Sequence, residues 1–117
     1  RLPADVDDSK RIAVILSELG VDLLDVSAGG IHPDQQIPPY TTGYQVPFAE
    51  EIRAHLRAND ATMAVGAVGC IAMAEYADEL IRNGRADLAI VGREHLRDPR
   101  FTLNAAQQLG EDIDYVD

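Results

Sequence analysis

The fold class follows from one short apolar stretch, Val21-Asp22-Leu23-Leu24-Asp25-Val26-Ser27, which lies between Gly20 and Ala28-Gly29-Gly30. A run of this length between glycines is too short for a helix, so it predicts a buried strand. Two similar runs follow at residues 62–66 and 86–91, and small or Gly-rich residues come after each of them. The sequence therefore predicts three strands of the same kind, apolar on both faces.

Helical periodicity surrounds these three runs. Ile12, Ile15, Leu16 and Leu19 follow the spacing of one helix face, and Gly20 suits the position after a helix. Further helices are predicted from Pro47 onward, over residues 73–83 and over residues 99–109. Strands that alternate with helices of this length predict parallel βαβ units, and hence the α/β class.

Length and composition narrow the function further. The chain has 117 residues and a formal net charge of −10, which argues against a nucleic-acid partner. It is too short for a complete eight-stranded (β/α) barrel, which takes at least about 200 residues. No apolar run reaches the roughly 20 residues of a membrane span, so no membrane partner is expected. Cys70 is the single cysteine, which favours a reducing, cytoplasmic location.

Two of the predicted strands end in a way that suits a phosphate group. Gly66-Ala67-Val68-Gly69 ends the second, and Gly92-Arg93 follows the third at the start of a helix. Glycine lets a backbone approach an anion closely, and Arg can bind phosphate oxygens in a bidentate manner. Ordinary turn glycines and a surface arginine would explain each stretch alone. Together they predict a phosphate cradle at the carboxyl ends of the strands.

Other residues with reactive side chains support no catalytic assignment. His32, His55 and His95 have no metal-binding spacing, so no metal site is predicted. His32 lies in a long polar loop where it could meet a substrate, whereas His95 is expected on a helix surface. Cys70 follows Gly69 and could be partly exposed, but the role of a small buried residue is favoured. No Ser–His–Asp set and no paired carboxylates can be assembled, so no catalytic residue is assigned.

Several stretches resemble the old yellow enzyme family, in particular its bacterial NADPH dehydrogenase-like class. Residues 20–30 resemble the family's sixth barrel strand with its loop, and residues 66–69 resemble the end of strand seven. Gly43-Tyr44-Gln45-Val46-Pro47-Phe48-Ala49 is similar to the segment that opens the sixth helix. Residues 83–88, 91–94 and 96–99 resemble strand eight and the helix that follows it.

The resemblance implies a fold, a cofactor and a set of binding residues. The fold would be a partial (β/α)8 TIM barrel, with three parallel βα units that correspond to strands six to eight. The cofactor would be FMN, which passes hydride from NADPH or NADH to an activated alkene or a similar acceptor. Gly69, Gly92 and Arg93 would bind the FMN phosphate; Ser27, Ala28 and Gly29 would lie along the ribityl chain; Arg1 would touch the flavin pyrimidine.

The family's substrate-binding His pair, catalytic Tyr and N5-flanking residues belong to strands one to four, which this chain lacks. We therefore expect residues 1–117 to be a single, incomplete domain, the C-terminal segment of an FMN oxidoreductase, which alone does not hold FMN tightly. Two alternatives stay open. One is a stand-alone, non-catalytic barrel piece or assembly module, and the other is a different phosphate-binding barrel enzyme.

A piece of a barrel should not stay alone in solution. Open sheet edges carry unpaired backbone groups, and we expect Leu23, Val26, Val65, Leu88 and Ile90 to be exposed where strands are missing. The predicted partner is another copy of the chain, giving a homo-oligomer, or the rest of the barrel. The charge of −10 opposes self-association, so pairing should tighten as salt screens it.

Overall fold

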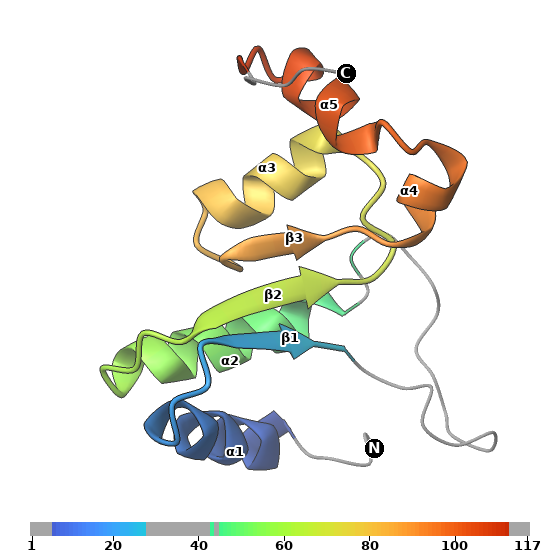
Figure 1. Ribbon diagram of the computed structural model, residues 1–117. Helices are drawn as coiled ribbons and strands as arrows, with labels where there is room; N and C mark the ends of the chain where they lie inside the picture. Colours follow the sequence, from blue (N-terminus) through green and yellow to red (C-terminus); the bar gives the residue numbers. More distant parts are fainter. Residues whose placement is uncertain (1–5, 28–42, 44, 113–117) are drawn as a thin grey trace, which may run out of the picture.

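The computed structural model describes residues 6–27, 43 and 45–112. Helices and strands alternate along the chain (Figure 1). The elements, in order, are α1 Val6–Glu18, β1 Leu23–Val26, α2 Val46–Ala58, β2 Ala64–Val68, α3 Ala74–Arg82, β3 Leu88–Ile90, α4 Arg93–Arg97 and α5 Phe101–Gln108.

The three strands form one parallel sheet in the order β1-β2-β3. Leu24 is opposite Val65 in the first pair, and Gly66 is opposite Leu88 in the second. Because all strands run the same way, their carboxyl ends lie at one edge of the sheet (Figure 1). The predicted α/β class and the three parallel strands are confirmed.

The helices cover one face of this sheet and form the core with it. In Figure 1, α2 lies behind the sheet, where it packs against β2, while α3 packs against β3 and α1 packs against α2. Leu56, Leu80, Val46 and Val65 are the largest fully buried side chains. Gly20 follows α1 with a φ of +94°, which suits the predicted role after a helix.

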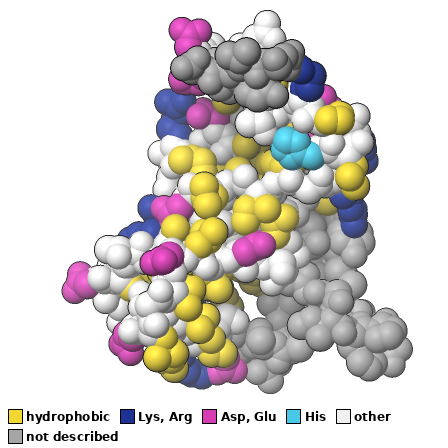
Figure 2. All heavy atoms as spheres, viewed as in Figure 1, with side chains coloured by type: hydrophobic (Ala, Val, Ile, Leu, Met, Phe, Trp, Pro, Cys, Tyr) yellow, Lys and Arg dark blue, Asp and Glu magenta, His cyan; other side chains and the backbone are white. Residues whose placement is uncertain are grey.

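The opposite face of the sheet is uncovered within the described residues. Leu23 and Leu88 are 44% and 46% exposed there, and Figure 2 shows hydrophobic side chains gathered over the sheet on this side. The expected exposure of Val26 and Val65 is wrong, because strand side chains alternate between faces. These two valines point into the helix layer, where they are 7% and 0% exposed.

Helix α1 also differs from expectation. Ala13 is its buried residue, while Ile12, Ile15 and Leu19 are 53%, 52% and 76% exposed. The apolar spacing predicted the helix correctly. Leu16 of that face is partly buried against the core, whereas the other three side chains are exposed in the described part of the chain. Strand β2 spans Ala64–Val68 rather than residues 62–66, so both of its predicted ends are wrong by two residues. The carbonyls of Ala61 and Met63, before the strand, accept hydrogen bonds from Arg57 instead. The predicted last helix is preceded by the short α4.

Candidate functional site

The backbone changes direction sharply where β2 ends. Gly69 has a φ of +126° and Cys70 a φ of +52°, both in the region that L-residues rarely adopt. The Gly69 carbonyl accepts a hydrogen bond from the Gly43 N–H at 3.1 Å. The predicted turn after this strand is thus held from outside by a residue 26 positions earlier in the chain.

A second contact from the same segment reaches the last residue of β2. The side chain of Gln45 is 4% exposed, and its Nε2 donates to the Val68 carbonyl at 2.8 Å. Gly43 lies in the left-handed region at φ +66°, and a Cβ there would overlap the Tyr76 hydroxyl. Glycine is therefore needed at position 43 for two reasons, conformation and space.

Gly92 and Arg93 follow β3 and begin helix α4, as predicted. No heavy atom lies within 4 Å of the place that a Cβ on Gly92 would occupy. The Gly92 carbonyl accepts the first backbone hydrogen bond of α4, from the His95 N–H at 3.0 Å. The space beside the Gly92 backbone is therefore open at the point where Arg93 begins the helix.

The two strand ends enclose a cavity of about 410 Å³. Residues 68–72 form one wall, and the other wall consists of Ile90, Gly92, Arg93, Glu94 and Arg97. Arg97 donates to Glu94 at 3.2 Å, so the lining carries two positive charges and one paired negative charge. A cavity with excess positive charge stands out on a chain of net charge −10.

These features fit a phosphate monoester. The open backbone at Gly92 allows close approach, and guanidinium groups suit phosphate oxygens. Arg97 was not selected from the sequence, although its spacing of four from Arg93 places both side chains on one helix face. Gln45 was also missed, because its role depends on a carbonyl 23 residues away.

The structure brings together three of the predicted binding residues: Gly69, Gly92 and Arg93. Ser27 is exposed and directly follows β1. Arg1, Ala28 and Gly29 lie outside the described residues, as does His32. Whether any of the seven contacts a cofactor stays a prediction.

Two of the other residues considered from the sequence have clear positions. Cys70 is half-buried and lines the cavity, so the expectation of a buried residue is wrong. The reason is the left-handed backbone, which keeps Cys70 in the turn instead of the core. His95 packs edge-on against Phe101 with 5.6 Å between ring centroids, and its Nε2 lies 3.1 Å from Thr102 Oγ1. It lies on the surface of α4, as expected.

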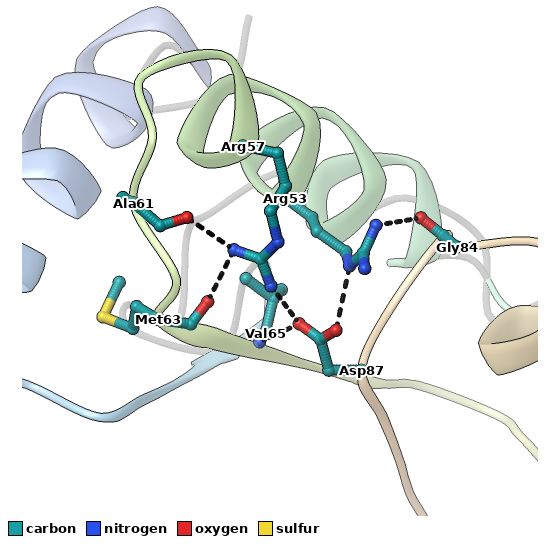
Figure 3. A network of polar contacts seen from close by, with 7 residues as sticks. All are labelled: Arg53, Arg57, Ala61, Met63, Val65, Gly84 and Asp87. Carbon is teal, nitrogen blue, oxygen red and sulfur yellow. Dashed lines mark hydrogen bonds and ion pairs between the residues drawn. The ribbon is translucent and has the colours of Figure 1, made fainter.

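The amino ends of β2 and β3 carry a different cluster (Figure 3). Asp87 accepts hydrogen bonds from Arg53 at 3.0 Å, from Arg57 at 2.8 Å and from the Val65 N–H at 2.8 Å. Arg53 also donates to the Gly84 carbonyl. We call Arg53, Arg57, Val65 and Asp87 the Asp87 cluster; it ties α2 to both strands.

The carboxyl group of Asp87 has a lowered pKa. Its partial burial alone would raise the pKa, but the Val65 N–H and the two arginines outweigh that effect. The group is therefore ionised at neutral pH and bound on both oxygens. This arrangement is structural, since Arg53, Arg57 and the Val65 N–H all belong to the scaffold.

Within the described residues, no three His, Cys, Asp or Glu side chains come close enough together to hold a metal ion. None of the helices in this part of the chain combines the length and the hydropathy needed to cross a bilayer.

Comparisons with known proteins place the chain in a family. The family model for the NADH:flavin oxidoreductase / NADH oxidase family matches residues 4–112. The NADPH dehydrogenase of Listeria monocytogenes (serotype 4a, strain HCC23) is 53% identical over 95 residues, which cover 81% of this chain and 26% of that protein. The NADPH dehydrogenase of Bacillus subtilis (strain 168) is 47% identical over 110 residues, covering 93% of this chain and 30% of the relative.

The chain thus spans between 26% and 30% of the length of these relatives. The match nevertheless extends over nearly all of its own residues, from helix α1 to the end of α5. The resemblance noted from residues 20–30, 43–49 and 83–99 is confirmed. This chain belongs to the NADH:flavin oxidoreductase / NADH oxidase family.

Proposed function

We propose that this chain forms the FMN-phosphate-binding part of an NAD(P)H-dependent FMN oxidoreductase of the ene-reductase type. One observation carries the proposal: Gly69, Gly92 and Arg93 surround a single cavity at the carboxyl edge of the sheet. Parallel α/β proteins bind ligands at this edge. Membership of a flavin oxidoreductase family supports FMN as the phosphate-bearing ligand.

The residues of the chain would hold the cofactor in place. Arg93 offers a guanidinium to the phosphate, and the open space at Gly92 lets the phosphate come close to the backbone. Ser27, with Ala28 and Gly29, would follow the ribityl chain, and Arg1 would meet the pyrimidine edge of the ring. When bound, FMN would supply the hydride transfer, while the protein supplies position and charge.

In this proposal the three strands are the sixth to eighth of a (β/α)8 barrel, and residues 1–117 are one incomplete domain. The uncovered sheet face, with Leu23 and Leu88 about half exposed, supports a missing partner layer. That layer is either the rest of the barrel or a second copy.

A binding comparison tests the cofactor assignment. The ¹⁵N-labelled chain is titrated with FMN, riboflavin and ribose 5-phosphate, and NMR follows the amides of Gly69, Cys70, Gly92 and Arg93. We expect weak binding in which FMN binds more tightly than riboflavin, which lacks the phosphate. Equal affinities for FMN and riboflavin would refute the phosphate site. If ribose 5-phosphate binds as tightly as FMN, the alternative of a flavin-independent phosphate-binding enzyme is favoured.

A further inference from the structure

Gly43 and Gln45 contact the carboxyl end of β2 without lining the cavity. Gly43 N–H donates to the Gly69 carbonyl at 3.1 Å, and Gln45 Nε2 donates to the Val68 carbonyl at 2.8 Å. Both Val68 and Gly69 line the cavity, whereas neither Gly43 nor Gln45 does. These two donors therefore hold two consecutive peptide units of the cavity wall, although neither donor residue lines the cavity.

Those two peptide units need such support. Gly69, at φ +126°, has no Cβ to restrict it, so the peptide that follows it can rotate. A rotated peptide would direct its carbonyl oxygen toward an anion in the cavity, which is repulsive. A peptide is planar and trans, so its N–H points away from its C=O. When Gly43 holds the Gly69 carbonyl, it also sets the direction of the Cys70 N–H.

The support itself is rigid. Gln45 is buried and enters α2 directly, because Val46 is the first residue of that helix. The Val46 N–H donates to the Gly43 carbonyl at 2.9 Å, which closes the turn between them. Gly43 in turn lies against the Tyr76 side chain of α3. Two helices thus fix the donors that hold the strand end.

From these contacts we propose that Gln45 is a positioning residue for the phosphate site, resting on the proposed function above. Its side-chain amide holds the Val68–Gly69 backbone in the orientation that receives a phosphate. Val68 and Gly69 line the cavity together with Gly92 and Arg93, where the phosphate is proposed to bind. Loss of the Gln45 donor should therefore weaken phosphate-bearing ligands and leave others unchanged.

The test replaces Gln45 with Met, which keeps the size of the side chain and removes the donor. We expect FMN to bind about tenfold more weakly, because a misdirected backbone would lose one hydrogen bond to the charged phosphate. Riboflavin affinity should change less than about twofold. The amide shifts of Gly69 and Cys70 should move without any ligand present. Gln107→Met, on the exposed end of α5, is the matched control and should change neither affinity.

Circular dichroism and thermal unfolding show whether the variant folds. If Gln45→Met does not fold, Gln45→Leu decides, because it also removes the donor and buries no charge. A folded variant that still prefers FMN to riboflavin as the wild type does would overturn the role of Gln45. A wild-type chain without that preference would instead overturn the proposed function, so the two failures are distinguishable.

Discussion

The two edges of the sheet use the same residue types for opposite purposes. At the amino edge, Arg53 and Arg57 both bind Asp87 and several backbone carbonyls, so their donors are consumed by the scaffold. At the carboxyl edge, Arg93 and Arg97 line a cavity next to glycines. Arg53 and Arg57 stabilise the fold through one carboxylate that they share, whereas Arg93 and Arg97, the latter paired with Glu94, bring positive charge to a cavity lined by glycines.

The largest effect is expected at the amino edge. Asp87→Ala leaves two guanidinium groups and the Val65 N–H without their common acceptor. The Asp87 side chain is 25% exposed, so we expect a loss of about 2 kcal/mol in the free energy of unfolding, less than for a fully buried pair. Urea denaturation measures it. Asp78→Ala, which breaks an exposed pair with Arg82, should cost less than about 0.5 kcal/mol.

The same cluster should make stability depend on acid. The pKa of Asp87 is lower in the folded chain than its ordinary value of 3.8. Its stabilisation is therefore complete above pH 3.8 and is lost as the pH falls through the lower folded value. Urea midpoints of the wild type should fall more steeply than those of Asp87→Asn between about pH 5 and about pH 2. Parallel curves would mean that other carboxyl groups carry the acid response.

At the carboxyl edge, the charge of Arg93 should affect the binding of a phosphate group. We expect Arg93→Ala to weaken FMN binding about tenfold while riboflavin binding stays the same. Arg93→Lys should recover only part of that loss, since lysine lacks the bidentate fork. Isothermal titration calorimetry measures both ligands. Arg82→Ala is the control for charge alone, because Arg82 is 73% exposed on α3. An equal loss in the control would reduce the effect to net charge.

The smallest effect on stability is expected at Gly92. Its φ is −107° and nothing lies near a Cβ placed there, so Gly92→Ala should change the unfolding free energy by less than about 0.5 kcal/mol. The methyl group would nevertheless fill space beside the backbone of the cavity wall. FMN affinity should fall in a chain whose thermal midpoint is unchanged. A loss of stability instead would mean that Gly92 is a structural turn glycine.

The sequence predicted the residues at the carboxyl edge of the sheet but not the cluster at its amino edge. Gly69, Gly92 and Arg93 could be grouped because each follows an apolar run, and parallel strands bring such positions to one edge. Arg53 and Arg57 are four residues apart, which places them on one helix face. Their partner Asp87 could not be identified, because a helix pattern does not say which strand lies beneath it.

The exposure of individual side chains was harder to predict than the order of the helices and strands. The three strands and their order along the chain were predicted from the apolar runs, yet Val26 and Val65 were placed on the open face. The error comes from register, since a one-residue shift exchanges the two faces of a strand. Cys70 was misjudged for a related reason: its left-handed φ of +52° has no signature in a non-glycine residue.

The position of Cys70 has a practical consequence. It is the single thiol of the chain and is half-buried on the wall of the cavity. The access of a reagent to its sulfur should therefore depend on whether that space is filled. The rate at which an alkylating reagent modifies it becomes a gauge of occupancy that needs no engineered label. A bound phosphate ester would shield the thiol, and slower alkylation would then report binding even for ligands that neither absorb light nor fluoresce.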